Sequence, residues 1–296
     1  MPATCPLSRA RATSPDGIAT AMRGAMPALA LALALAALLA LSASQAAAQA
    51  PTRPLNDTGQ VTCYNASAAT GTVSPSTPAP EAPGFEGQDC THGAAMYDAR
   101  GAMNKVGASS TMGRDYTKIA NDGSELAASA PLGPNPGDWA CTRDNITGLI
   151  WEVKVNNVAH LRHSGHTYTW YDTNAAVNGG NAGTPGGTGC NGTLAQCNTT
   201  AFRDAVNALT GANRLCGATD WRLPTRAELQ SLVDYQAQNP AIDTTWFPNT
   251  PATIYWTGEN YVPSASSAWG VSFDNGDLGT NNKGNNRRVR LVRGGQ

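Results

Sequence analysis

The feature that most constrains the fold is a predicted helix start within the stretch from Cys216 to Asp234. Thr225 is a good N-cap, and Glu228 lies three positions later, so its side chain can reach back to the Thr225 main-chain N–H and close a capping box. Pro224 ends the extended segment before the cap, because its ring biases the preceding residue toward extended geometry. Apolar residues then recur at helical spacing at Leu229, Leu232 and Val233. The stretch therefore predicts a strand, a sharp corner and an amphipathic helix.

The N-terminus has the pattern of a secretory signal peptide. Arg9, Arg11 and Arg23 precede an apolar run from Pro27 to Leu41, and small residues follow at Ala46–Ala48. The apolar run is shorter than the about 20 residues that a membrane span needs. We therefore expect residues 1–48 to be a cleaved signal peptide and the mature chain to have no transmembrane segment. The expected location is secreted, periplasmic or at the cell surface.

The cysteines fit export into an oxidising compartment. Seven cysteines become six once Cys5 leaves with the signal peptide, and an even count in an exported chain indicates disulfides. Six cysteines allow 15 pairings, which order alone does not resolve. No Cys-x2–4-Cys spacing indicates a metal site. The pairs we expect are Cys63–Cys90, Cys141–Cys216 and Cys190–Cys197.

The charge of the mature chain excludes one class of partner. The signal peptide holds three arginines and one aspartate, which leaves 17 basic and 20 acidic residues. A net charge near −3 predicts no general affinity for polyanions, so we expect no nucleic-acid partner.

The mature chain divides into two parts. Residues 49–113 read as an N-terminal extension with a loop rich in Pro, Ser and Thr from Pro75 to Pro83. Residues 114–296 read as the main domain. A helix capped by Thr199 or Thr200 and ending at Leu209 would precede the helix after Thr225. Short strands and long Gly- and Asn-rich loops fill the remainder, which predicts an α+β domain of short antiparallel strands with two helices.

Several segments of the main domain resemble one known family in the same order. They are Asp144–Glu152, Tyr168–Tyr171, Trp221–Leu229, Asn239–Asp243, Phe247–Asn249, Tyr255–Trp256, Ala268–Trp269 and Val289–Arg293. Together they resemble the C-terminal domain family of the Legionella collagen-like protein and, more distantly, formylglycine-generating enzymes. The resemblance covers roughly residues 114–296. It implies a C-type-lectin-like fold, a homotrimer and binding of sulfated glycosaminoglycans.

The stretch from Thr257 to Arg287 is the most informative one for function. Short amide and carboxylate side chains there neither pack well nor favour strands, but they offer adaptable donors and acceptors, as binding loops do. A plain solvated hairpin tip is the alternative. The pattern also resembles the variable region of diversity-generating retroelement targets. The residues expected to contact a ligand are Glu259, Asn260, Tyr261, Asn275, Asp277, Asn281, Asn282, Asn285, Asn286, Arg287, Arg288 and Arg290.

The arginines near the C-terminus form a second candidate feature. Guanidinium groups suit the geometry of sulfate, which the resemblance implies as a ligand. Arg288 and Arg290 alternate with Val289 and Leu291, so they could instead be charges on a strand surface. Together these features predict a non-catalytic protein that binds an extracellular glycan or a surface protein through residues 257–293.

Other classes of function have weaker support. The histidines at 160, 163 and 166 lack the spacing and carboxylates of a metal site, so we expect no metal and no cofactor. No cysteine follows Cys216, so the redox pair of formylglycine-generating enzymes is missing. An enzyme using the His160–His166 segment with Asp234 or Asp243, and a self-assembling surface protein, remain alternatives. We expect the tryptophans to be core residues, with Trp246 and Trp256 as the exceptions.

Overall fold

The computed structural model describes residues 62–65, 69–72 and 114–294. Strands β1 (Thr62–Tyr64) and β2 (Ala69–Thr72) form a short antiparallel hairpin. The predicted signal peptide and most of the predicted extension, including Cys90 of the expected Cys63–Cys90 pair, lie outside the described residues. In the described part of the chain, no helix is long and apolar enough to cross a membrane.

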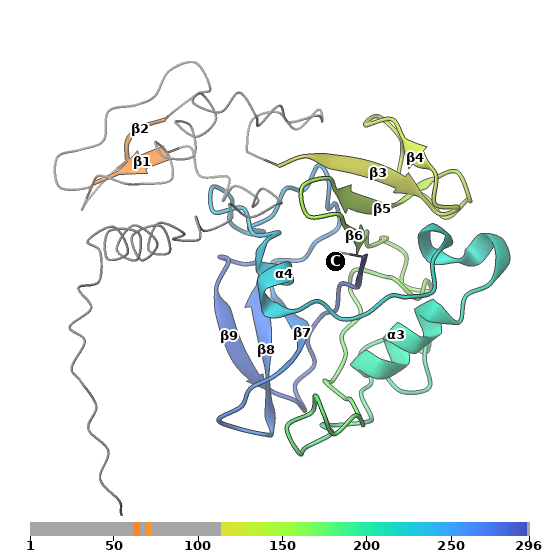
Figure 1. Cartoon of the computed structure of the whole chain (residues 1–296), viewed down its shortest axis with the longest axis vertical. Coiled ribbons are helices and arrows are strands. Elements are labelled where there is room, and N and C mark those ends of the chain that lie inside the picture. The colour runs from red at the N-terminus through yellow and green to blue at the C-terminus, as the bar shows by residue number, and fades with distance from the viewer. Residues whose placement is uncertain (1–61, 66–68, 73–113, 295–296) are drawn as a thin grey trace, which may run out of the picture. The chain divides into compact units, whose positions relative to one another are not determined.

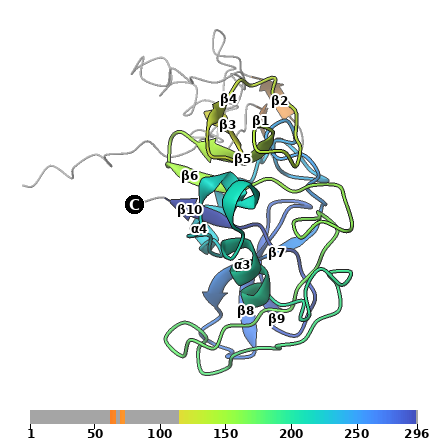
Figure 2. The same cartoon turned by 90° about the vertical axis from the view of Figure 1, so that its right-hand side faces the viewer.

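Residues 114–294 contain a five-stranded antiparallel sheet in the order β10-β6-β5-β3-β4 (Figure 1). The turn between β5 and β6 forms because the Asp144 side chain accepts hydrogen bonds from the N–H groups of Ile146 and Thr147. The last strand of the chain, β10, pairs with β6 beside it (Figure 2). The strands are β3 (Tyr116–Ala120), β4 (Glu125–Leu126), β5 (Trp139–Asp144), β6 (Leu149–Glu152) and β10 (Val292–Gly294).

A separate three-stranded antiparallel sheet holds the sequence region singled out for function. It consists of β7 (Ile254–Asn260), β8 (Ser267–Ser272) and β9 (Leu278–Asn282). Gly276, with φ +89°, supplies the left-handed residue of the β8–β9 turn. Two residues of the asparagine run, Asn281 and Asn282, lie on β9 and pair with β8. Tertiary pairing here outweighs the weak strand preference of asparagine.

The two α-helices of residues 114–294 form where the sequence predicted helices. Helix α4 (Arg226–Gln230) starts with the predicted capping box between Thr225 and Glu228. Helix α3 (Thr199–Asn207) buries Phe202 and Val206 on one face. Its N-cap is Asn198 rather than Thr199 or Thr200, since the Asn198 side chain accepts a hydrogen bond from Ala201 N at 2.8 Å. Short 3-10 turns cover Gly211–Asn213 (η1) and Leu215–Gly217 (η2).

Two of the expected disulfides are present. Cys141 of β5 is bonded to Cys216 of η2, and Cys190 is bonded to Cys197 just before α3. The first bond joins two segments 75 residues apart in sequence. Closing so long a loop is worth about 4 kcal/mol in the chain-entropy treatment.

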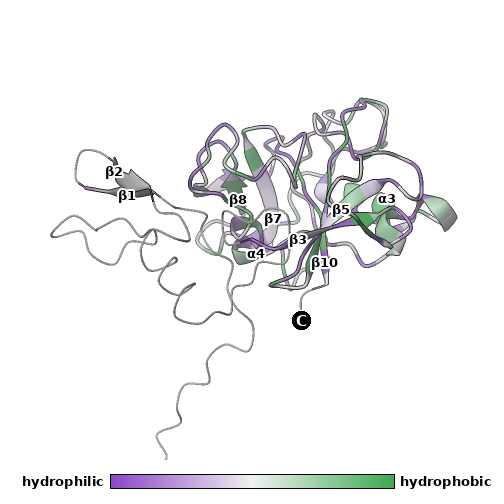
Figure 3. Cartoon of the chain, turned by 90° about the horizontal axis from the view of Figure 1, so that it is seen from above, coloured by the Kyte–Doolittle hydropathy of each residue, from purple (hydrophilic) through white to green (hydrophobic). Residues whose placement is uncertain are grey.

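Two hydrophobic cores pack on opposite sides of β7. Trp256 belongs to one core with Tyr168, Phe202 and Trp221, while its neighbour Tyr255 belongs to the other with residues such as Trp151 and Phe247. Apolar residues on β8 and α3 are visible among polar loops in Figure 3. The observed class is a sheet-rich α+β fold, as expected. Because successive strand residues point to opposite faces, β7 has core on both sides.

Candidate ligand-binding surfaces of the C-terminal sheet

The sheet of β7, β8 and β9 exposes part of each face. Trp269 and Val271 lie on one face of β8, and Ala268 and Gly270 lie on the other. Val271 belongs to the core that contains Tyr255, and Ala268 to the core that contains Trp256. Each core covers only part of its face, so a different corner of the sheet remains accessible on each side.

The first accessible corner surrounds Trp269. The other six tryptophans are at most 4 % exposed, whereas Trp269 is half-buried. The expectation that Trp246 and Trp256 would be the exceptions was wrong, since both are buried. Trp269 therefore differs from every other tryptophan in the chain.

Arg226 and Tyr261 flank the Trp269 ring. The Arg226 guanidinium, at the first position of α4, lies 4.7 Å from the ring centroid. The Tyr261 ring meets the indole edge to face, with centroids 5.1 Å apart. Glu259 holds Arg226 through an ion pair of 3.1 Å and also accepts the Arg226 main-chain N–H. We name Arg226, Glu259, Tyr261 and Trp269 the Trp269 platform.

Sequence reasoning included two members of the Trp269 platform, Glu259 and Tyr261, and missed the other two. Trp269 alternates with Val271 and Phe273, which indicated a core residue. Arg226 follows the N-cap Thr225 at the start of α4, and nothing in the local sequence indicates that it contacts Trp269. Only the packing of α4 on β8 brings Arg226 to Trp269.

The second accessible corner is a shallow hollow on the opposite face. Gly270 and Gly279 lie directly opposite each other on β8 and β9 and form its floor. A side chain at Gly279 would meet nothing within 4 Å, so the space above it is open. The hollow measures about 290 Å³. We name this space the glycine hollow. The residues that line it are Ile254, Gly270, Ser272, Asp274, Asn275, Asp277, Gly279, Thr280 and Asn281.

The residues expected to contact a ligand do not form one surface. Glu259, Tyr261 and Asn282 share the face of Trp269, whereas Asn260 and Asn281 share the face of Gly270. Asn275 and Asp277 occupy the β8–β9 turn, where the Asn275 amide donates a hydrogen bond to the Asp277 carboxylate. Asn285 and Asn286 are exposed just beyond β9.

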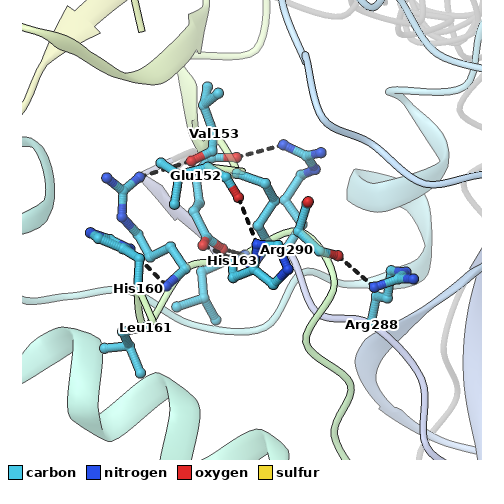
Figure 4. A network of polar contacts seen from close by, with 12 residues as sticks. Glu152, Val153, His160, Leu161, His163, Arg288 and Arg290 are labelled. Atoms are coloured by element: carbon cyan, nitrogen blue, oxygen red, sulfur yellow. Dashed lines mark hydrogen bonds and ion pairs between the residues drawn. The ribbon is translucent and has the colours of Figure 1, made fainter. Parts of the chain in front are cut away.

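Arg290 is a correction to the predicted set, because its side chain is fully buried. Figure 4 shows it donating to the Glu152 carbonyl, at 2.6 Å, and its other terminal nitrogen donates to Thr250 Oγ1 at 2.7 Å. Its neighbours Val289 and Leu291 are buried as well. Alternation predicted an outward side chain, but this segment runs through the interior and has no solvent side.

The remaining arginines are spread apart by their partners. Arg287 donates to Asn281 Oδ1 at 3.0 Å, Arg288 donates to the Ser164 carbonyl, and Arg293 pairs with Asp220 at 2.6 Å. The four arginines therefore do not present their guanidinium groups as one exposed cluster.

The histidines at 160, 163 and 166 contact main-chain groups, and Figure 4 shows the first two of them. His160 Nδ1 accepts from the Arg162 N–H at 3.0 Å, His163 Nδ1 lies 3.3 Å from the Val155 carbonyl, and His166 Nε2 lies 3.1 Å from the Val158 carbonyl. Burial lowers the pKa of His160 and of His166. Among the described residues, no group of three or more His, Cys, Asp or Glu side chains could hold a metal ion.

Comparison with known proteins places the chain in one family. No curated protein matches it. The family model of the Lcl C-terminal domain matches residues 140–293, which is more than half of the chain and includes both candidate surfaces. The chain belongs to the Lcl C-terminal domain family.

Proposed function

We propose that this chain is an exported protein that binds an uncharged extracellular glycan through the Trp269 platform, on a C-type-lectin-like scaffold. The observation that carries the proposal is the exposure of Trp269 beside Tyr261, in a chain whose other six tryptophans are buried. Leaving a large aromatic ring partly in water forgoes burial energy, so a surface tryptophan of this kind favours a binding role.

The chemistry of the Trp269 platform suits a sugar. Aromatic rings pack against the C–H face of a pyranose, while polar groups at the ring edge bind its hydroxyls. Here the indole N–H can donate, the Glu259 carboxylate can accept and the Arg226 guanidinium can donate. Tryptophan, tyrosine and arginine are also the residues that contribute most to binding energy at interfaces.

An uncharged glycan fits the distribution of charge better than a sulfated one. Sulfate recognition needs exposed guanidinium groups that converge. Arg290 is buried, Arg293 is paired with Asp220, and Arg226 is paired with Glu259 inside the Trp269 platform. These pairings leave little free positive charge near Trp269.

Export is supported by the two disulfides of the described domain, because such bonds persist in oxidising compartments. Secretion, the periplasm and the cell surface all satisfy this requirement. The proposed ligand is correspondingly extracellular.

A glycan array tests the proposal, using the chain from residue 49 onward together with two variants. Trp269→Ala removes the centre of the Trp269 platform. Tyr235→Ala is the matched control, since Tyr235 is another partly exposed aromatic, 45 % exposed, outside that platform. We expect the wild type and Tyr235→Ala to bind neutral glycans, and Trp269→Ala to lose this binding. Binding confined to heparin and chondroitin sulfate, or an empty array, would overturn the proposal.

A further inference from the structure

Within the described residues, β9 is an edge strand with one open side. It pairs with β8 and with no other described strand, and Figure 1 shows it at the outer edge of the three-stranded sheet. An open edge presents unpaired N–H and C=O groups to which another extended chain can bind.

The hydrogen bonds flanking β9 identify which groups are open. Ser272 N donates to Asp277 O at 2.8 Å, and Lys283 N donates to Ser266 O at 2.9 Å. Hydrogen-bonded pairs alternate along an antiparallel ladder, so the main-chain groups of Gly279 and Asn281 face β8. Those of Leu278 and Thr280 consequently point away from β8. No described residue donates to or accepts from the main chain of Leu278 or Thr280.

The edge has few of the features that prevent strand addition. Proteins protect open edges with lysine, proline, bulges or a covering helix. The β9 sequence, Leu278–Asn282, contains neither a charged residue nor a proline, and β8 pairs along it without a register shift. This edge is therefore competent to accept a strand.

The glycine hollow lies beside this edge and has a definite charge. Its lining includes the carboxylates of Asp274 and Asp277 and contains no lysine, arginine or histidine, and the guanidinium of Arg287 adjoins it only at Asn281, at the other end of β9 from Asp277. In an added strand, alternate side chains would project over the face that holds Gly279. A long cationic side chain fits both the open space above Gly279 and the two carboxylates.

We propose that β9 binds an extended, lysine-containing segment of a partner protein as a fourth strand, with a lysine side chain over the glycine hollow. The main-chain groups of Leu278 and Thr280 would supply the hydrogen bonds, and Asp274 and Asp277 the charge selectivity. This site is separate from the Trp269 platform, which lies on the other face of the sheet.

Peptide binding followed by fluorescence anisotropy tests this inference on the disulfide-bonded chain. The probe is a labelled peptide of alternating threonine and lysine, about six residues long, as in an average strand. The critical variant is Thr280→Pro, because proline is tolerated where an edge N–H faces solvent but removes that donor. Thr280→Ala, which keeps the N–H, is its matched control. A thermal melt confirms that both variants fold.

We expect saturable binding by the wild type and Thr280→Ala, and at least tenfold weaker binding by Thr280→Pro. Asp274→Asn with Asp277→Asn should also weaken binding and reduce its salt dependence. Amide hydrogen exchange at Leu278 and Thr280 should slow when the peptide is added. The proposal would be overturned if Thr280→Pro bound the peptide as tightly as the wild type does. It would also be overturned if the wild type bound a threonine–glutamate peptide equally well, or bound no peptide at all. Concentration-dependent self-association that Thr280→Pro abolishes would also overturn it, because a second copy would then occupy the edge.

Discussion

Lys154 and Glu152 form an ion pair inside the domain, with Lys154 Nζ 2.8 Å from Glu152 Oε1 and side chains that are 3 % and 0 % exposed. The other Glu152 carboxylate oxygen accepts the Leu291 N–H at 3.0 Å, and the Glu152 carbonyl accepts from Arg290. The pair therefore links β6 to the segment that leads into β10. Lys154 Nζ also lies 4.5 Å from the centroid of the Phe202 ring.

Removing one member of this pair should be far more damaging than neutralising both. Glu152→Gln leaves Lys154 buried without its anion, beside the buried guanidinium groups of Arg162 and Arg290, so we expect the free energy of unfolding to fall by about 3–5 kcal/mol. In Lys154→Met with Glu152→Gln the lysine charge is no longer stranded, and the glutamine oxygen can still accept the Leu291 N–H. Urea denaturation with the disulfides intact should show the double variant to be the more stable. A double variant as unstable as the single one would contradict this account of the pair.

The same lysine predicts how stability depends on pH. Burial lowers the pKa of Lys154 to about 8, although the Glu152 charge opposes the shift. An unfolded lysine has a pKa of about 10.4, so between these values the unfolded chain binds more protons and stability rises with pH.

Above pH 10 the tyrosines reverse this trend. Burial raises the pKa of Tyr116 and of Tyr255 to about 12, so each keeps its proton in the folded chain while the unfolded chain loses it. We expect the urea midpoint to rise from pH 8, pass through a maximum near pH 10 and then fall. The rise should shrink in Lys154→Met with Glu152→Gln, leaving the contribution of Lys118 and Lys283, whose pKa values burial also lowers. A urea midpoint that falls steadily from pH 8 would contradict the predicted direction of the lysine contribution.

The capping box of α4 should matter for both stability and binding. Thr225→Ala removes the acceptor for the Glu228 N–H and should cost about 1 kcal/mol, whereas Thr225→Ser should retain most of it. Because α4 begins at Arg226, fraying of its first turn also displaces Arg226 from Trp269. Thr225→Ser should therefore have both a higher melting temperature and a higher glycan affinity than Thr225→Ala. Unchanged glycan affinity in Thr225→Ala would separate Arg226 from the binding surface.

The two glycines of the hollow should respond differently to a side chain. A Cβ at Gly270 would lie 2.8 Å from Ile254 Cγ2 and 2.9 Å from the Tyr255 carbonyl oxygen, whereas one at Gly279 meets nothing within 4 Å. Gly270→Val should thus lose about 1–3 kcal/mol through overpacking, and Gly279→Val should unfold at nearly the wild-type urea concentration. Equal losses at the two positions would mean that the floor of the hollow is not open at Gly279.

Local rules accounted for the parts of the fold that sequence reasoning predicted correctly. The Thr225–Glu228 capping box depends on residues three apart, and the buried face of α3 depends on the helical spacing of Phe202 and Val206. These local predictions were correct because the tertiary packing of α3 and α4 favours the same conformations as the local sequence. The Cys141–Cys216 pair was also predicted, although residue order alone left other pairings open.

The errors came from residues whose environment is set by distant segments. Arg290 alternates with Val289 and Leu291 as a surface residue would, yet the segment lies between two cores and all three are buried. Trp269 has the spacing of a core residue. The core that contains Tyr255 includes Val271 but not Trp269, which lies beside Arg226 instead. Neither outcome can be inferred without knowing how α4 and the C-terminal segment pack. The residues predicted to contact a ligand therefore include much of one sheet, but they are divided between its two faces.

The most direct test of the central claim is isothermal titration of the best neutral glycan from the array against the wild type, Trp269→Ala and Arg287→Ala. We predict that Trp269→Ala abolishes the binding heat while Arg287→Ala, which alters a basic residue outside the Trp269 platform, changes the affinity less than twofold. Retained binding by Trp269→Ala, or loss with Arg287→Ala alone, would contradict it.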